Sequence, residues 1–434
     1  MRRASDREWD MKRAFVWIGF VALWGGCGDD GGGREPQEVV VETFNVALAG
    51  AFIPFETERR QPITEAIAAA DSDVLCLQEV WTQSDKELIR DAAMETYPHI
   101  VFFENDLDTP IDVPTDQQGE IPPAPTTVPC PDVEVEGIPG LTIEDQMNQA
   151  VDCLRDNCST IPGSDEGQTT SADCAASECV TAVAGLLLGS AEQQRCYACV
   201  VTQLPTEQLS EIRTSCTTVI NQDLAFDGQN GLMLLSRHPI DDEEELVLPG
   251  TWNRRTILRA TVNLPNGAEL DAYCNHLTPI FDDFTFPYTG QYGNGFTDAR
   301  GWQAEQELQA EKLIDYVTDT SGNRPAVILG DLNAGRAFPA QDIVAEGEPT
   351  LDLLETVFEP AYASSYTPQC TFCSTNPVTD AETSSWIDHI LLYNLASDAV
   401  LSTARVYDEA VVPVDSQTVP LSDHFGMRSV ILVP

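Results

Sequence analysis

Six short polar motifs constrain this chain most strongly, because most of them end an apolar, β-branched run. The motifs are Thr43-Phe44-Asn45-Val46, Leu77-Gln78-Glu79-Val80, Asn275-His276-Leu277-Thr278, Gly330-Asp331-Leu332-Asn333, Ile387-Asp388-His389 and Ser422-Asp423-His424. Such runs are typical of buried strands, whose polar tips then lie at one edge of a sheet. Open α/β sheets form their binding sites at such edges. The motifs therefore predict an α/β fold with a polar site drawn from distant parts of the sequence.

The order of the expected elements selects among α/β architectures. Strands are expected over 39–46, 74–78, 99–103, 256–263, 269–275, 326–330, 386–392 and 429–433, and helices over 56–70, 85–96 and 298–318. Strands alternate with helices early and crowd together later, which favours a two-sheet α/β sandwich over a doubly wound fold. No G-x-G-x-x-G follows the first strand and no G-x-x-x-x-G-K-[ST] occurs, so a nucleotide-binding domain has no support. The acidic run 241–245 is expected to be a solvated loop, with calcium binding as the alternative.

The first residues have the composition of a targeting segment. Met11-Lys12-Arg13 gives a positive start, residues 14–24 form an apolar run too short to span a bilayer, and Cys27 follows two glycines. Residues 1–27 resemble a bacterial lipoprotein signal with Cys27 as the lipidated residue, and 28–37 read as a flexible tether. We therefore expect an exported protein that associates with a membrane of the cell envelope through Cys27. A cleaved secretion signal, which would give an extracellular protein, is the alternative.

A change in composition divides the rest of the chain. The segment 106–228 is rich in Asp and Glu, and it holds eight cysteines between Cys130 and Cys216. We expect it to be an acidic, Cys-rich and mainly helical insertion. The flanking segments 38–105 and 229–434 would then form one α/β domain, and the length of 434 residues suffices for a large domain with an insertion.

Cysteine usage also indicates the compartment. Thirteen cysteines suit an oxidising environment, and an even twelve remain when Cys27 is set aside. The Cys-x2-Cys pairs at 196/199 and 370/373 favour disulfides over a zinc site because they lie far apart in an exported chain. Cys76 and Cys274 fall in core strands and are candidates for free buried thiols.

Two of the motifs suggest a cation site. Glu79 follows four residues of a mostly apolar strand, and a carboxylate is costly to bury unless a metal or another partner compensates it. Magnesium prefers oxygen ligands and keeps several waters, so Glu79 with the amide of Asn45 would be a minimal site. The alternative for Glu79 is a cap on the next helix.

The other motifs suggest acid–base chemistry. Asp331 and Asn333 share one face of an extended segment and could orient a water or a phosphoryl oxygen, although an Asx-turn explains them too. His424 has the pKa range of a general base, and Asp388 is the natural partner to hold its tautomer. His276, at the end of its strand, could donate to a phosphate.

With these residues in place, the chain resembles the endonuclease/exonuclease/phosphatase superfamily, whose founding member is deoxyribonuclease I, over roughly 38–105 and 229–434. The resemblance implies a deoxyribonuclease I-like fold and Mg²⁺-dependent hydrolysis of a phosphodiester, with Mn²⁺ or Ca²⁺ as alternative cations. The roles it implies are metal binding at Asn45 and Glu79, phosphate contact at His276, positioning of water or phosphate by Asp331 and Asn333, base catalysis by His424 oriented by Asp388, and support of the metal or base by Asp423.

Weaker signals concern the substrate. Leu77-Gln78-Glu79-Val80-Trp81 and residues 231–240 are similar to the neutral sphingomyelinase branch of that superfamily. The net charge of −47 repels polyanions, whereas a zwitterionic phospholipid headgroup is approached at little cost. We therefore expect a monomeric phosphodiesterase acting on a phospholipid headgroup. The alternatives are a secreted nuclease acting on DNA or RNA, and a non-catalytic surface protein that binds partners through its insertion.

Overall fold

The computed structural model describes residues 35–434 except 112–127, 205, 219–223, 282–285 and 380. The predicted signal at 1–27, its Cys27 and residues 28–34 of the predicted tether lie outside the described residues. Within the described part of the chain, no helix combines the length and the apolar character needed to cross a membrane.

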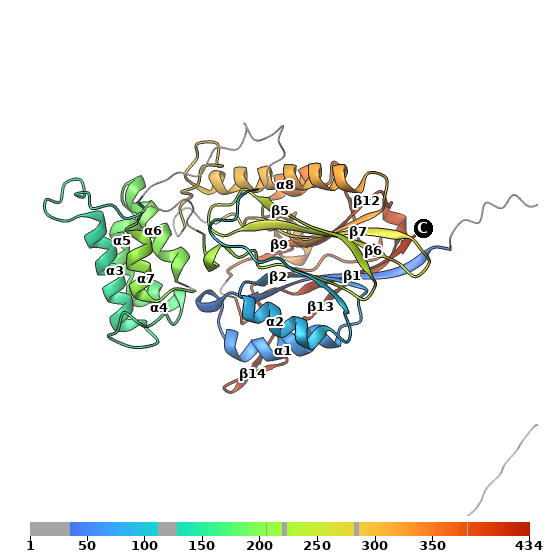
Figure 1. Cartoon of the computed structure of the whole chain (residues 1–434), viewed down its shortest axis with the longest axis horizontal. Coiled ribbons are helices and arrows are strands. Elements are labelled where there is room, and N and C mark those ends of the chain that lie inside the picture. Colours follow the sequence, from blue (N-terminus) through green and yellow to red (C-terminus); the bar gives the residue numbers. More distant parts are fainter. Residues whose placement is uncertain (1–34, 112–127, 205, 219–223, 282–285, 380) are drawn as a thin grey trace, which may run out of the picture. The chain divides into compact units, whose positions relative to one another are not determined.

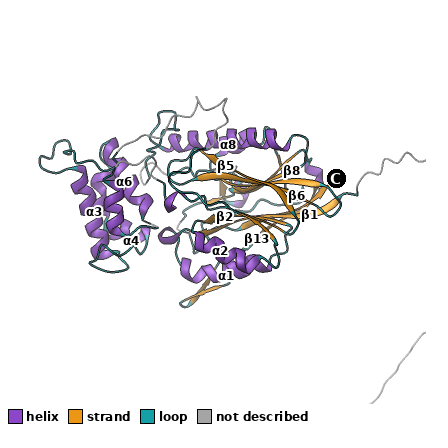
Figure 2. Cartoon of the chain, in the orientation of Figure 1, coloured by secondary structure: helices purple, strands orange, loops and turns teal. Residues whose placement is uncertain are grey.

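Two six-stranded sheets form the centre of the fold (Figure 2). The first has the order β13-β16-β1-β2-β4-β3 and comprises β1 (Gln37–Leu48), β2 (Val74–Val80), β3 (His99–Val101), β4 (Met233–Ser236), β13 (Val400–Val406) and β16 (Gly426–Val433). The second has the order β10-β12-β8-β7-β6-β5 and comprises β5 (Ile240–Leu248), β6 (Arg255–Asn263), β7 (Glu269–His276), β8 (Ala326–Asp331), β10 (Glu359–Pro360) and β12 (Asp388–Tyr393). The pairs β1–β2 and β7–β8 are parallel.

Helices cover the outer faces of both sheets (Figure 1). Helices α1 (Glu56–Ala69) and α2 (Gln83–Ala93) pack on the first sheet, and α8 (Ala299–Ser321) and α9 (Glu348–Leu354) pack on the second. A third apolar cluster fills the space between the sheets, with Val41 and Val74 facing Leu258 and Val327. Alternate residues of each strand thus enter different apolar layers, as a two-sheet sandwich requires. The predicted two-sheet α/β sandwich is confirmed.

A disulfide joins the two sheets inside the core. Cys76 of β2 and Cys274 of β7 are bonded, with their Cα atoms 5.3 Å apart, and both are fully buried. The expectation of free thiols at these positions was wrong. Both side chains enter the layer between the sheets, and their strands lie opposite one another there.

The acidic run at 241–245 is part of β5, so the expectation of a solvated loop was wrong. β5 is the edge strand of the second sheet, and the side chains of Asp241–Glu244 are exposed. A register shift between Asp241 and Glu244 marks a bulge, and Asp242 has a left-handed backbone with φ 52°. Charged side chains and a bulge are usual on an edge strand because they prevent pairing with another chain.

The insertion contains a small helical bundle of its own. It comprises α3 (Ile143–Asn157), α4 (Ala172–Glu178), α5 (Val180–Leu187), α6 (Ala191–Gln203) and α7 (Leu209–Cys216). Its eight cysteines form the disulfides Cys130–Cys196, Cys153–Cys179, Cys158–Cys174 and Cys199–Cys216. Cys370 and Cys373 also form a disulfide, so both Cys-x2-Cys pairs are disulfide-bonded rather than zinc-binding. The domain boundaries at 106–228 stay a prediction.

Short elements complete the described chain. They are the strand pairs β9 (Ile343–Val344) with β11 (Ser384–Ser385) and β14 (Val412–Val414) with β15 (Gln417–Val419), and the 3-10 turns η1 (Gly50–Phe52), η2 (Phe226–Gly228), η3 (Pro339–Gln341) and η4 (Ser397–Ala399).

Candidate active site

Strand register brings the six motifs to one place. In the second sheet Asp331 lies opposite both His276 and Asp388, because β8 is the common neighbour of β7 and β12. In the first sheet Asn45 pairs with the residue that precedes Glu79. The two groups face each other where the sheets meet, and the contacts below join them into one site.

The amide of Asn45 links the carboxylates of the two sheets. Its Nδ2 donates to Glu79 Oε1 and to Asp331 Oδ2, both at 3.0 Å, while its Oδ1 accepts from the Ala47 amide. Glu79 and Asn333 have left-handed backbones, with φ 61° and 48°. Asn adopts this conformation at low cost but Glu does not, so the fold holds Glu79 under strain at the end of β2.

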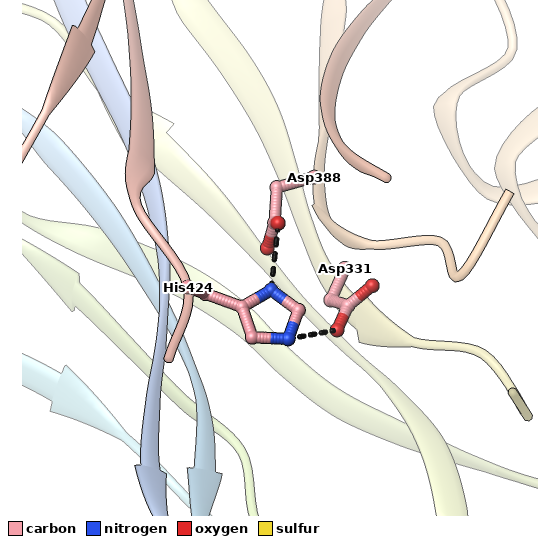
Figure 3. A group of neighbouring side chains, drawn as sticks. All are labelled: Asp331, Asp388 and His424. Carbon is pink, nitrogen blue, oxygen red and sulfur yellow. Dashed lines mark hydrogen bonds and ion pairs between the residues drawn. The ribbon is translucent and has the colours of Figure 1, made fainter. Parts of the chain in front are cut away.

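His424 lies between two carboxylates (Figure 3). Its Nδ1 donates to Asp388 Oδ2 at 2.8 Å, and its Nε2 lies 3.8 Å from Asp331 Oδ2. Burial alone would lower the pKa of His424, but the charges of Asp388, Asp331 and Asp423 outweigh it and raise that pKa well above its usual value. The bond to Asp388 fixes the ring so that Nε2 faces the centre of the site.

Residues to which the sequence analysis gave no role hold this loop. Ser422 Oγ donates to the Asn45 carbonyl at 2.7 Å and accepts from the His424 amide at 3.1 Å. Asn376 Nδ2 donates to the carbonyls of Ser422 and Asp423. Ser422 stood inside a recognised motif, but nothing in the sequence marks Asn376, which lies 46 residues away from Ser422.

His276 approaches the same carboxylate from β7. Its Nε2 lies 3.4 Å from Asp331 Oδ2, and its Nδ1 has no hydrogen-bond partner among the described residues. Burial, and then the charge of Arg255, lower the pKa of His276 well below its usual value. The ring is therefore neutral at physiological pH and can donate one hydrogen bond.

Asn333 and Asp423 border this network. Asn333 Nδ2 donates to the Leu277 carbonyl at 2.9 Å, and its backbone amide donates to Asp331 Oδ1 at 2.9 Å, so its amide nitrogen is used by the fold. Asp423 Oδ1 accepts from Ser422 Oγ at 3.1 Å, and its charge acts on Glu79 and His424. The structure thus brings all eight predicted site residues together, while their catalytic roles stay predictions.

The crowding of carboxylates fits a bound cation. Burial and the charge of Asp423 raise the pKa of Glu79, and burial and the charge of Asp388 raise the pKa of Asp331 to about 8. Asp388 Oδ1 is buried without a hydrogen-bond partner in the described chain. A divalent cation would compensate these oxygens, which are the ligand type that Mg²⁺ prefers.

Two donor sets are available for such an ion. Asp331, Asp388 and His424 place ligand atoms within 4.8 Å of one another. His424 Nδ1 already donates to Asp388, however, which suits an oriented acid–base group better than a metal ligand. Glu79 and the amide of Asn45 leave His424 free for that role, and Asn45 Oδ1, which accepts from the Ala47 amide, has a second lone pair that could bind the ion.

The chain matches a known family over nearly its whole length. The sequence model of the Endonuclease/Exonuclease/phosphatase family matches residues 43–424, which begin and end at the first and last motifs of the site. Among curated proteins, no relative matches the chain.

Several solved structures resemble the chain distantly. One is an endonuclease/exonuclease/phosphatase family protein from Bacteroides thetaiotaomicron, with 11% identity over 92% of this chain and 99% of that chain and a TM-score of 0.47. Sphingomyelinase C from Streptomyces griseocarneus has 15% identity over 91% and 99%, with a TM-score of 0.46. Beta toxin from Staphylococcus aureus has 11% identity over 90% and 99%, with a TM-score of 0.44. Likenesses this distant carry no information about the substrate of this chain.

Proposed function

The chain belongs to the endonuclease/exonuclease/phosphatase family, and we propose that it is a divalent-metal-dependent phosphodiesterase. Members of this family are generally hydrolases of phosphoester bonds. The observation that carries the proposal is the line of Asp388, His424 and Asp331 beside Glu79 and Asn45. It combines an oriented histidine with a cluster of oxygen donors, which is what water attack on phosphorus needs.

His424 acts as the general base in this proposal. Asp388 accepts the Nδ1 proton and orients Nε2 toward the site. The surrounding carboxylates raise the pKa of His424, and a cation bound beside them would oppose that shift, so that neutral Nε2 can take a proton from water. Asp331, with Asn333, orients the water or a phosphoryl oxygen, and neutral His276 donates to the phosphate. A divalent cation held by Glu79 and Asn45, supported by Asp423, would stabilise negative charge on the phosphoryl oxygens.

The proposed substrate is the phosphodiester of a phospholipid headgroup. With 70 Asp and Glu against 23 Lys and Arg, the surface disfavours DNA and RNA, whose binding relies on basic side chains at phosphates. A zwitterionic headgroup carries no net charge and meets no such barrier. Six disulfides suit an oxidising compartment outside the cytoplasm, and a lipid on Cys27 would bring the protein to a membrane.

A parallel assay tests the proposal. Sphingomyelin, phosphatidylcholine and plasmid DNA are each incubated with the protein in Mg²⁺ or EDTA. We expect Mg²⁺-dependent cleavage of a lipid by the wild type and by His99→Ala, a matched control on β3, and none by His424→Ala. Cleavage of DNA alone would establish a nuclease instead. Cleavage of none of the three substrates would leave a non-catalytic protein. Cleavage at equal rates by His424→Ala and the wild type would refute His424 as the general base.

A further inference from the structure

Three buried side chains beside the carboxylates have nitrogen atoms without hydrogen-bond partners. Trp81 Nε1, Arg255 Nε and Nη1, and His276 Nδ1 form no hydrogen bond with the described residues. The three side chains are only 2%, 2% and 3% exposed. They are also neighbours, because the Trp81 ring lies 5.9 Å from the Arg255 guanidinium carbon and 6.3 Å from the His276 ring. Unpaired buried donors are rare, and a group of them indicates a missing acceptor.

Arg255 differs from the other arginines of its strand region. Arg254 donates to the carbonyls of Gly228 and Asp106, and Arg259 forms ion pairs with Glu244 and Asp271. Nε and Nη1 of Arg255 are buried and form no hydrogen bond within the described chain. Arg254 and Arg259 thus bind carbonyl or carboxylate groups of the protein itself, whereas Nε and Nη1 of Arg255 bind none.

The charge of Arg255 nevertheless interacts with the carboxylates of the site. Burial lowers the pKa of Arg255 to about 10, against the attraction of Glu79 and Asp331, so the guanidinium stays charged at neutral pH and its field reaches both carboxylates. It faces these carboxylates without touching them. A buried charge that lacks a direct partner destabilises a fold, so it is usually kept for a ligand of opposite charge.

Packing holds Trp81 rigidly beside it. Its ring stacks on Phe226 at 4.4 Å with an interplanar angle of 2°. A Cβ at Gly231 would lie 2.6 Å from a ring atom of Trp81, so this glycine allows the backbone to press against the ring. An indole held by these contacts presents its N–H in one direction, which is the preorganisation that anion stabilisation requires.

We propose that Arg255 and Trp81, next to His276, form a pocket for the non-bridging oxygens of the substrate phosphate. Arginine suits this task because its planar fork can donate two parallel hydrogen bonds to a phosphate and is always charged. The inference rests on the proposed function for its choice of a phosphodiester, but the pocket binds phosphate whether or not turnover follows. Arg255 and Trp81 are then substrate-contacting residues.

Inorganic phosphate is the probe for this pocket. The melting temperature of the full-length protein is measured against phosphate concentration without added metal, for the wild type, Arg255→Met, Arg255→Lys, Trp81→Phe and Arg259→Lys. Arg259→Lys is the matched control because Arg259 is a buried cation on the same strand. We expect phosphate to raise the melting temperature of the wild type and the control. Its affinity should fall roughly 100-fold or more in Arg255→Met and about 10-fold in Trp81→Phe, with Arg255→Lys between the wild type and Arg255→Met.

Stability without phosphate separates ligand binding from a structural role. Arg255→Met removes an uncompensated buried charge, so its melting temperature should equal or exceed that of the wild type. A lower melting temperature with an intact phosphate response would assign Arg255 to the fold and overturn the inference. No phosphate response in the wild type would overturn it as well.

Turnover distinguishes this inference from the proposed function. Phosphate binding that depends on Arg255 in a protein that cleaves no phosphodiester would support the pocket and refute the phosphodiesterase. Hydrolysis by the wild type with an unchanged kcat/KM in Arg255→Met would refute the pocket and leave the phosphodiesterase standing. Loss of both phosphate binding and hydrolysis in Arg255→Met supports both.

Discussion

Removal of the Cys76–Cys274 disulfide should destabilise the sandwich more than removal of any short-range disulfide. Cys76 lies three residues before Glu79 and Cys274 two residues before His276, so this bond fixes the two sheets close to the site. The perturbation is the double variant Cys76→Ala with Cys274→Ala. Both positions are fully buried, and alanine fits them without steric overlap.

The magnitude follows from the length of chain that the bond closes. For a sequence separation of 198 residues, the loop-entropy relation gives a destabilisation of about 5 kcal/mol at 25 °C. The same relation gives about 2 kcal/mol for Cys370–Cys373, which are separated by 3 residues and serve as the matched control. Since a folded domain is stable by only about 5–15 kcal/mol, the first loss is large enough to bring the sandwich near unfolding.

Urea unfolding followed by tryptophan fluorescence measures this effect. Four of the seven tryptophans, at 81, 252, 302 and 386, lie in the sandwich and none lies within 106–228, so the change of signal on unfolding reports on the sandwich and not on the helical insertion. We expect a much lower urea midpoint for the Cys76/Cys274 variant than for the Cys370→Ala/Cys373→Ala control. A loss below about 1 kcal/mol, or one no larger than that of the control, would refute the reasoning and show that apolar packing alone holds the sheets together.

Three further outcomes follow from the site and its surroundings. Asp388→Asn should lower kcat/KM roughly 10³- to 10⁴-fold, because it removes the charge that orients His424; a loss below about tenfold would contradict that role. Mg²⁺ should restore activity after EDTA treatment and raise the melting temperature of the wild type, and Glu79→Gln should weaken both responses; full activity in EDTA would exclude a required cation. Burial lowers the pKa of His389 to about 4, so its neutral form stabilises the fold above pH 6.5 and this stability is lost as the pH falls from about 6.5 to 4. Urea midpoints at pH 7 and pH 4 should show about 3 kcal/mol more acid destabilisation in the wild type than in His389→Gln, and equal losses would contradict the assignment.

The strands and their polar tips could be predicted because the local sequence determines them. Apolar, β-branched runs specify the strands, and the structure places β1, β2, β6, β7 and β8 within a few residues of the expected ranges. Their polar tips could be expected to meet because parallel neighbours end at the same sheet edge. The alternation of apolar and polar residues did not predict the strand at 241–245. This edge strand has charged residues on both sides and thus lacks the apolar face that reveals a strand.

Contacts between the two sheets could not be predicted, because they depend on how one sheet is placed over the other. Composition marks Cys76 and Cys274 only as residues of core strands, and 198 residues separate them. The central position of Asp331 in the site also depends on how one sheet is placed over the other. Its neighbours in the second sheet follow from register, but its bonds to Asn45 of the first sheet and its approach to His424 do not.

The neighbouring arginines 254 and 255 show that the sequence does not determine which of two adjacent side chains faces the site. Successive side chains of an extended segment point in opposite directions, so only one of the two can face the site. Charge and residue type do not say which, since both are arginines, with Arg254 directly before β6 and Arg255 as its first residue. In the structure Arg254 donates to backbone carbonyls, whereas Arg255 lies over Trp81 with unpaired N–H groups and under the influence of Glu79. A one-residue change of register would exchange these two environments, so the assignment of a phosphate ligand depends on the pairing of β6 rather than on the residue type.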